Sequence, residues 1–146
     1  MPSDLAPAKI FGVPVEGAAY QPRPAAYAVI KTAGGAVAAV RSKSGYYFLP
    51  GGGARTDETA AETVRRELRE ELAREVRLVR ELGRAVQYFC ADGVYYRMAA
   101  VFFATEFAGE PTGAGEHQLH WLQAEELTTA FFHQCHVWAV NGCPQA

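Results

Sequence analysis

Hydrophobic and polar residues alternate over short runs along much of the chain, which is the pattern of β-strands with one buried face. Residues 27–32 and 36–41 predict two such strands. Gly34 and Gly35 lie between them and suit a tight hairpin turn, because glycine readily adopts the positive φ that such turns require. Residues 46–50 predict a short third strand.

The strand pattern returns after residue 75, where aromatic and β-branched residues predict two or three further strands up to residue 107. Asp92 and Gly93 interrupt this stretch and predict a second hairpin turn. Residues 117–123 are expected to form the last strand. Residues 124–140 are expected to form one or two helices.

One amphipathic helix is predicted between the two groups of strands. Thr59 and Glu62 fit a capping box, in which each side chain accepts a bond from the other residue's free backbone amide. We expect the helix to run from residue 60 to residue 73. Its apolar stripe consists of Ala61, Val64, Leu68 and Leu72.

The 146 residues are sufficient for one domain with its own core. With 49% hydrophobic and 21% charged residues, the chain has the composition of a folded protein. Five prolines in residues 1–24 predict an N-terminal arm with no long regular element and room for one short strand. We expect this arm to be part of the same unit as a single domain over residues 25–146.

Charge and targeting signals limit the classes of partner. The net charge of −2 comes from 14 basic and 16 acidic side chains, which is too balanced for a polynucleotide-binding protein. No apolar run reaches the roughly 18 residues that span a bilayer, and no secretory leader is recognisable. We therefore expect a cytoplasmic protein without a membrane partner.

The three cysteines are expected to be reduced thiols, because their number is odd and none forms a CxxC pair. A zinc cluster near the C-terminus is the alternative, but the spacing of its ligands fits no zinc pattern. Those ligands would be His133, Cys135, His136 and Cys143.

Three carboxylates converge on one side of the predicted helix. Glu67, Glu70 and Glu71 fall within about a 100° arc, because positions i, i+3 and i+4 share a helix face. Such crowding raises the pKa of at least one carboxyl group unless a cation neutralises it. Hard oxygen ligands without nearby histidine or cysteine favour magnesium or manganese over zinc, and magnesium commonly binds phosphate too. The helix therefore indicates phosphate chemistry.

A simpler interpretation of this helix is a solvated face held by i,i+4 ion pairs, such as Glu62 with Arg66 and Glu70 with Arg74. The glycine run at 51–53 favours the metal site, because backbone amides without side chains can approach an anion closely. The two features together are more specific than either alone.

The order of these residues resembles the Nudix box, GX5EX7REUXEEXGU. Gly52 is followed by five residues and Glu58, then by seven residues and the sequence RELREE at 66–71. The match covers the 23 residues from 52 to 74. It implies an α/β fold, the Nudix α/β/α sandwich with a mixed, curved β-sheet between helices.

Two positions depart from the box, because Ala73 replaces its final glycine and Arg74 its last apolar residue. Glycine past a helix end adopts a left-handed conformation without strain. Alanine is expected either to add about 1 kcal/mol of strain there or to let the helix continue for another turn. The carboxylates lie upstream of this departure.

The resemblance implies a MutT-like hydrolase that cleaves the pyrophosphate linkage of a nucleoside diphosphate-X substrate with Mg²⁺ or Mn²⁺. A nucleoside triphosphate or modified nucleotide is the first candidate substrate. The alternatives are ADP-ribose, a dinucleoside polyphosphate, or a sensor domain that binds a nucleotide without turnover. The expected partner is a small-molecule nucleotide, and a homodimer is left open.

The resemblance also implies roles for single residues. The expected metal ligands are Glu58, Glu67, Glu70 and Glu71, and Glu58 is expected either to bind a second metal or to support the loop. Arg66 is expected to orient a box glutamate through a charge-assisted hydrogen bond. Glu70 is the first candidate for the general base, and Glu116, in a glycine-rich loop before the last strand, is the second.

Substrate contacts are expected from the glycine run and the residue that follows it closely: Gly51, Gly52, Gly53 and Arg55. A base-stacking aromatic residue is also expected, because a flat ring is bound at little cost by stacking. The candidates are Tyr20, Tyr27, Tyr46, Tyr88, Tyr96 and Phe131.

Overall fold

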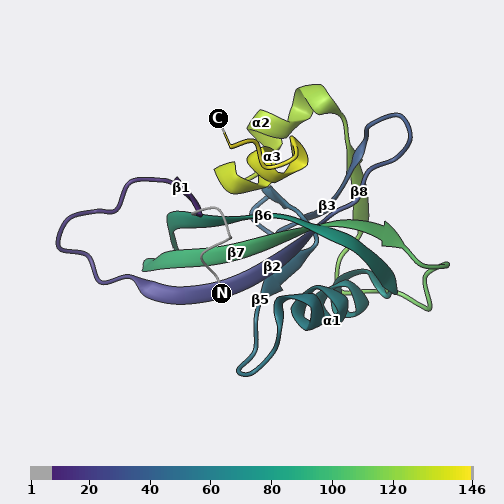
Figure 1. The fold of residues 1–146 in the computed structure, drawn as a ribbon, viewed down its shortest axis with the longest axis horizontal. Coiled ribbons are helices and arrows are strands. Elements are labelled where there is room, and N and C mark those ends of the chain that lie inside the picture. Colours follow the sequence, from purple (N-terminus) through teal and green to yellow (C-terminus); the bar gives the residue numbers. More distant parts are fainter. Residues whose placement is uncertain (1–7, 146) are drawn as a thin grey trace.

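The computed structural model describes residues 8–145 and contains two β-sheets with helices on both sides (Figure 1). The larger sheet has five strands in the order β1-β6-β7-β2-β5. Their bounds are β1 Lys9–Phe11, β6 Val76–Ala91, β7 Val94–Phe107, β2 Gln21–Val29 and β5 Gly51–Gly53. The sheet is mixed, because β1 pairs parallel to β6 and β2 parallel to β7, whereas the other pairs are antiparallel.

The smaller sheet is antiparallel and has the order β4-β3-β8. Its strands are β4 Tyr47–Phe48, β3 Val37–Arg41 and β8 Leu119–Leu122. The helix α1, Ala60–Leu72, lies on one face of the larger sheet, and α2, Leu127–Ala130, and α3, Gln134–Val140, lie on the opposite face (Figure 1). A short 3-10 helix, Ala124–Glu126, precedes α2. The predicted α/β/α sandwich is confirmed.

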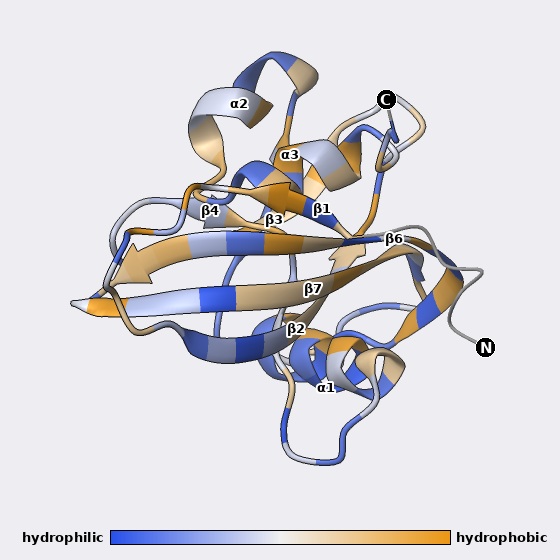
Figure 2. Cartoon of the chain, turned by 60° about the vertical axis from the view of Figure 1, so that its left-hand side comes forward, coloured by the Kyte–Doolittle hydropathy of each residue, from blue (hydrophilic) through white to orange (hydrophobic). Residues whose placement is uncertain are grey.

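Strand β2 separates two hydrophobic clusters, because its residues point alternately to the two faces of the sheet. Ala26 and Ala28 face α1, where they join Val64, Leu68 and Leu72. The small alanines let the helix pack closely on the strand. The side of α1 that faces the strands is hydrophobic, and its outer side is hydrophilic (Figure 2). The intervening residues of β2 belong to the second cluster, with Phe102, Trp138 and other residues of β7 and α3.

The predicted start of this strand at residue 27 is wrong, since β2 begins at Gln21 and runs through Pro22 and Pro24. The amide of Ala28 donates to the carbonyl of Pro50, so even-numbered residues of β2 direct their amides to the β5 side. Strand β5 ends at Gly53, and the missing donors of the two prolines therefore face no strand.

The predicted hairpin at Gly34 and Gly35 is only partly formed. Lys31 and Val37 make a single antiparallel bridge beside this turn. Beyond it, β2 continues in the larger sheet and β3 in the smaller one, so the two strands do not form a ladder. The sequence pattern could not reveal this separation, because it depends on the partners that each strand meets later in the chain.

The second hairpin is confirmed. Strands β6 and β7 are joined through Asp92 and Gly93, whose φ values of 51° and 78° are those of a two-residue turn matched to the twist of the strands. The last strand and the two short C-terminal helices also form where the sequence predicts them. The glycine run, however, forms the edge strand β5 and not an irregular loop.

Helix α1 begins with the predicted capping box between Thr59 and Glu62. It ends at Leu72, and Ala73 takes the left-handed conformation with φ 54° and ψ 39°. The amides of Ala73 and Arg74 then donate to the carbonyls of Arg69 and Leu68, which closes the helix end. Of the two outcomes expected for alanine here, the structure has the strained helix end.

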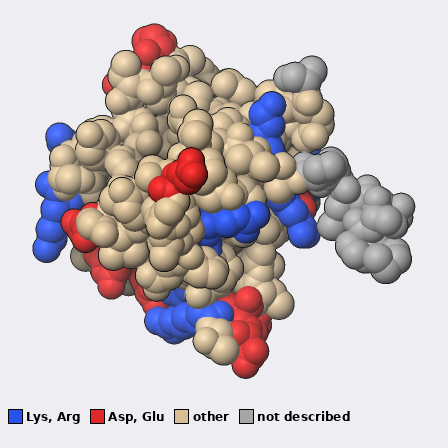
Figure 3. Space-filling model, turned by 90° about the vertical axis from the view of Figure 1, so that its left-hand side faces the viewer, with Lys and Arg blue, Asp and Glu red and all other residues tan. Residues whose placement is uncertain are grey.

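Lysine and arginine side chains are scattered among other residues on the face drawn in Figure 3, and no continuous basic surface forms there. No helix among residues 8–145 is long and apolar enough to cross a membrane.

Two buried histidines, His133 and His136, lie in and beside the second cluster, at 3% and 0% exposure. His136 accepts a hydrogen bond at Nδ1 from the amide of Leu49, at 3.1 Å. Burial lowers the pKa of His133 to about 3 and that of His136 well below its usual value. Both imidazoles are therefore neutral in the folded protein.

We expect these histidines to make the protein less stable in acid. Below about pH 6.5 the unfolded chain gains protons that the folded protein does not bind, so each histidine lowers the free energy of unfolding by up to about 1.4 kcal/mol per pH unit. His133→Phe should remove one such contribution. Urea unfolding from pH 5 to 8 measures the difference in the free energy of unfolding between variant and wild type. The contributions of the other titrating groups cancel in this difference. A difference that does not change between pH 6 and pH 5 would contradict the assignment.

Ala73→Gly is expected to raise the free energy of unfolding by up to about 1 kcal/mol. Glycine relieves the left-handed strain, and its greater freedom in the unfolded chain offsets part of the gain. Ala61→Gly, in the regular part of α1, is the matched control and should lower stability. Equal losses in both variants, measured by urea unfolding, would show that Ala73 is not strained.

Candidate active site

A cleft of about 520 Å³ opens beside the larger sheet. It lies between the segment that joins β3 to β4 and the tip of the β6–β7 hairpin, with β2 and β5 along its floor. Its lining includes Gly51, Gly52, Glu71, Arg23, Phe132 and His133. A buried carboxylate at one end and aromatic rings at the other divide this cleft into two chemically different parts.

Glu71 is the carboxylate at the end of the cleft and is only 8% exposed. Its Oε1 accepts a hydrogen bond from the amide of Gly51 at 3.0 Å, which fixes its orientation. Burial raises its pKa to about 8, and the nearby charges of Glu67, Glu116 and Glu70 act in the same direction. Glu71 therefore lies in a site where a bound cation would replace a proton.

Glu67 lies one helical turn before Glu71 and faces β5. Burial raises its pKa as well, and the nearby guanidinium of Arg66 counteracts only part of this effect. Gly52 is essential to the arrangement, because a Cβ atom there would lie 2.3 Å from Oε2 of Glu67. The glycine strand thus lets α1 approach closely enough to place Glu71 at the cleft and Glu67 directly against Gly52.

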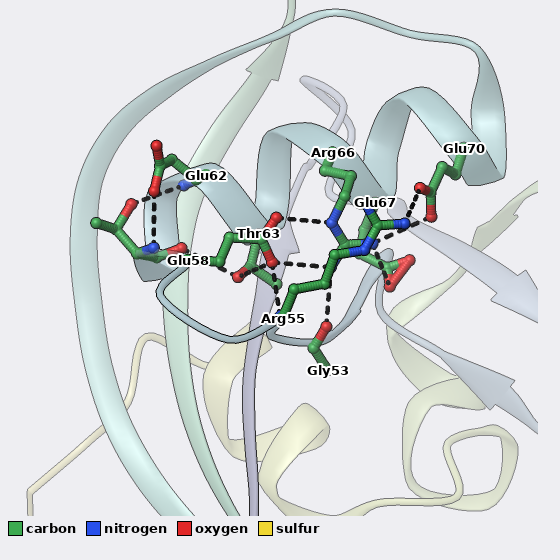
Figure 4. Close-up of polar contacts among 9 residues, drawn as sticks. Gly53, Arg55, Glu58, Glu62, Thr63, Arg66, Glu67 and Glu70 are labelled. Carbon is green, nitrogen blue, oxygen red and sulfur yellow. Dashed lines mark hydrogen bonds and ion pairs between the residues drawn. The ribbon is translucent and has the colours of Figure 1, made fainter.

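Arg66 joins α1 to the segment that precedes it (Figure 4). Its Nε and Nη2 donate to the two carboxylate oxygens of Glu58, at 2.7 and 2.9 Å, and Nη2 also donates to the carbonyl of Gly53 at 2.9 Å. Its Nη1 donates to Glu70 at 3.1 Å. The bidentate pair lowers the pKa of Glu58 to about 2. Arg66 therefore connects the middle of α1 to Gly53 and to the segment that precedes the helix.

Glu58 is held entirely by this network. Besides Arg66, it accepts hydrogen bonds from the hydroxyl of Thr63 and the amide of Arg55, both at 2.9 Å. It is not among the charges that raise the pKa values of Glu67 and Glu71. Of the two roles open to Glu58, these contacts favour support of the loop over metal binding.

Glu70 is turned towards two arginines. Its Oε1 accepts from Arg66 and its Oε2 from Arg55, both at 3.1 Å. Within residues 8–145, no three potential ligand side chains already stand in a metal-binding arrangement. The physical reason is mutual repulsion, because a third carboxylate next to Glu67 and Glu71 is more stable beside a guanidinium than in an uncompensated cluster.

Glu116 reaches the site on a loop that docks against the end of α1. The amides of Glu116 and His117 donate to the carbonyls of Glu70 and Glu71, at 2.9 and 2.8 Å. Gly115 permits this contact, since a Cβ atom there would lie 2.1 Å from the Glu71 carbonyl oxygen. The charge of Glu116 in turn raises the pKa of both Glu67 and Glu71.

These residues fit a divalent cation. Glu67 and Glu71 are two partly or fully buried carboxylates with raised pKa values, and neither has a close cationic partner: the nearest contact is Arg66 with Glu67 at 3.7 Å. Their oxygens are hard donors, which suit magnesium or manganese. Glu70 could join them by exchanging its arginine contacts for the cation.

The other predicted positions divide between the cleft and the outer surface. Gly51 and Gly52 line the cleft, although the amide of Gly51 is used by Glu71. Arg55 does not line it; its side chain is 66% exposed and pairs with Glu70 on the outer side. The two i,i+4 pairs named as examples of the solvated-helix interpretation do not form, since Glu62 accepts from the Thr59 amide and Arg74 contacts the ring of Phe107. One other i,i+4 pair, Arg66 with Glu70, does form.

Sequence reasoning missed several cleft residues. Tyr27, Tyr46 and Tyr96 line the cleft as candidates, whereas Tyr20, Tyr88 and Phe131 do not. The additional residues are Arg23, Phe48, Phe89, Phe132 and His133. Arg23 makes no ion pair within the described part of the chain, although it lies beside the glycine strand. No local signal marked these positions, because four separate segments contribute them.

Comparison with known proteins agrees with this geometry. The family model described as NUDIX domain matches residues 21–137, from the first residue of β2 into α3. No curated protein matches the chain. Among solved structures, the NUDIX hydrolase from Nitrosomonas europaea is similar with a TM-score of 0.68 at 14% identity, over 84% of this chain and 88% of the other.

Two further structures have the same fold. The MutT NUDIX hydrolase from Burkholderia pseudomallei has a TM-score of 0.66 at 23% identity, over 85% of this chain and 99% of the other. The E. coli dihydroneopterin triphosphate pyrophosphohydrolase has a TM-score of 0.63 at 17% identity, over 84% and 94%.

Glu71→Gln is expected to change the charge of the site while keeping the size and shape of the side chain. Glutamine keeps an acceptor for the Gly51 amide but removes the buried negative charge. Mg²⁺ should raise the melting temperature of the wild type, equivalent to about 1–3 kcal/mol near saturation, and should have little effect on the variant. Glu110→Gln, on an exposed loop, is the control. Equal Mg²⁺-dependent shifts in all three proteins would show that Glu71 does not bind the cation.

Proposed function

This chain belongs to the Nudix domain family, and from that premise we propose that it hydrolyses the pyrophosphate linkage of a nucleoside diphosphate-X substrate. The observation that supports this proposal most strongly is the buried carboxylate of Glu71 at the end of a cleft large enough for a nucleotide, with the half-buried carboxylate of Glu67 one helical turn away and only partly compensated by Arg66. We favour a nucleoside triphosphate as the substrate.

We propose that Glu67 and Glu71 hold Mg²⁺ or Mn²⁺, with Glu70 as a further ligand after it leaves the arginines. When bound, such a cation neutralises charge on the phosphate oxygens and helps to polarise the attacking water. The protein's own contribution is positioning: the Gly51 amide orients Glu71, and Arg66 fixes the segment that precedes the helix. Phosphoryl transfer depends mainly on such positioning and charge neutralisation.

Glu116 is the better candidate for the general base. Both oxygens of Glu70 accept hydrogen bonds from arginines, whereas Glu116 makes no ion pair within the described residues. Glu116 is exposed and lies close enough to Glu67 and Glu71 to raise their pKa values. A water molecule between these carboxylates could pass its proton to Glu116 as it attacks phosphorus.

Arg23 supports the orientation of the substrate. Its guanidinium lies beside Gly53 and affects the pKa of Glu67 at one end of the cleft and of His133 towards the other. An unpaired guanidinium at that position suits a phosphate group. The phosphates would then lie near Glu71 and the nucleoside among the aromatic rings.

The substrate class is chosen partly by analogy. The E. coli structure with the same fold is named for dihydroneopterin triphosphate, which shares its triphosphate chain with a nucleoside triphosphate. A cytoplasmic location and a homodimer stay predictions from the sequence.

A panel of nucleoside triphosphates, ADP-ribose and diadenosine polyphosphates, each with Mg²⁺ or Mn²⁺, tests the proposed function. Phosphate release after addition of pyrophosphatase or phosphatase identifies the bond that is cleaved. The account expects metal-dependent release of pyrophosphate and a nucleoside monophosphate from at least one triphosphate. Tight nucleotide binding without turnover would instead favour a sensor domain.

Glu116→Gln should lower kcat on the preferred substrate by roughly two to four orders of magnitude, the usual contribution of a general base. The Mg²⁺-dependent rise in melting temperature should persist, because Glu116 is not assigned as a metal ligand. Glu110→Gln is the control and should retain wild-type kcat. A variant with near-normal kcat and an unchanged acidic limb of the pH profile would transfer the role to Glu70.

A further inference from the structure

The aromatic end of the cleft contains a histidine with no structural task. His133 is the N-cap residue of α3, but its side chain makes no capping hydrogen bond. Its ring packs against three phenylalanines, with ring centroids 4.6 Å from Phe89, 4.9 Å from Phe132 and 5.5 Å from Phe48. All four residues line the cleft.

The imidazole of His133 is 3% exposed, and its buried Nδ1 has no hydrogen-bond partner within the described residues. Among the same residues, His136 also has one unpartnered buried nitrogen, Nε2, but its Nδ1 accepts from the backbone amide of Leu49 and it does not line the cleft. A phenylalanine at position 133 would fill the same aromatic environment without burying an unsatisfied polar group. Such a group is costly in the free protein. Because His133 also lines the cleft, a ligand bound there can supply the missing partner once the ring turns towards it.

We propose that His133 is a specificity-determining residue that hydrogen-bonds the polar edge of the substrate's nucleobase. This inference rests on the proposed function, because it takes the ligand to be a nucleotide. Arg23 and Glu71 define the phosphate end of the cleft, so the heterocycle lies towards Phe48, Phe89 and Phe132. Those rings offer flat apolar surface, and His133 supplies the polar group that distinguishes one base from another.

The chemistry of the site agrees with a neutral, uncharged ligand group. Burial is the main cause that keeps the imidazole unprotonated, so it offers one N–H donor and one acceptor nitrogen. Both match the ring nitrogens, exocyclic amines and carbonyls of a nucleobase. An anionic group would instead favour a charged side chain at this position.

The test measures binding and turnover separately. Calorimetry gives the affinities of the four common nucleoside monophosphates and of ribose 5-phosphate, which lacks a base, and steady-state kinetics give KM and kcat for the matching triphosphates. The variants are His133→Phe, which keeps an aromatic ring, and His133→Asn, which keeps a donor and an acceptor. His120→Phe, outside this cleft, is the control.

His133→Phe should raise the dissociation constant and the KM of the nucleotide with the preferred base by about ten- to a hundredfold. The variant should leave the affinity for ribose 5-phosphate and the kcat nearly unchanged, and it should reduce the preference among bases. His133→Asn should retain part of the affinity for the preferred base. An equal loss of affinity for ribose 5-phosphate, or an unchanged preference among bases, would overturn the inference. Base-selective binding that depends on His133 in a protein without turnover would retain the inference and reject only the proposed hydrolysis.

Discussion

The bidentate ion pair between Arg66 and Glu58 is the interaction on which the site depends. It connects the first residues after β5 to the middle of α1, and the same guanidinium also bonds the Gly53 carbonyl and Glu70. A side chain with this fork of donors can satisfy several acceptors at once, which a lysine cannot. Strand β5, the segment after it and α1 are thereby held in fixed positions, with Glu71 of the helix lining the cleft.

The site combines this rigid support with a local electrostatic cost. Glu67 and Glu71 are buried next to each other, and their raised pKa values show that the folded protein disfavours their charged forms. Strongly perturbed groups in a cleft are typical of functional sites. Glu70 instead pairs with Arg55 and Arg66. In the proposed function, Glu67 and Glu71 bind the cation and Glu70 joins them, while the same cleft continues into an aromatic pocket.

Local signals in the sequence predicted local structure well. The capping box at Thr59, the Asp92 turn and the helix between the two groups of strands all formed as expected, because neighbouring residues determine them. The start of β2, the separation of β2 from β3 and the strand character of the glycine run depend on distant partners. The turn of Glu70 towards Arg55 likewise follows from a contact 15 residues away in sequence. The aromatic pocket was missed for the same reason.

Diffraction from crystals soaked in Mn²⁺ tests the central claim most directly, because the anomalous signal locates the ion independently of activity. The account predicts a peak within coordination distance of both Glu67 and Glu71, with Glu70 rotated away from Arg55 towards the ion. A peak that involves Glu58 but neither of these two carboxylates, or no peak in this cleft at saturating Mn²⁺, would contradict it.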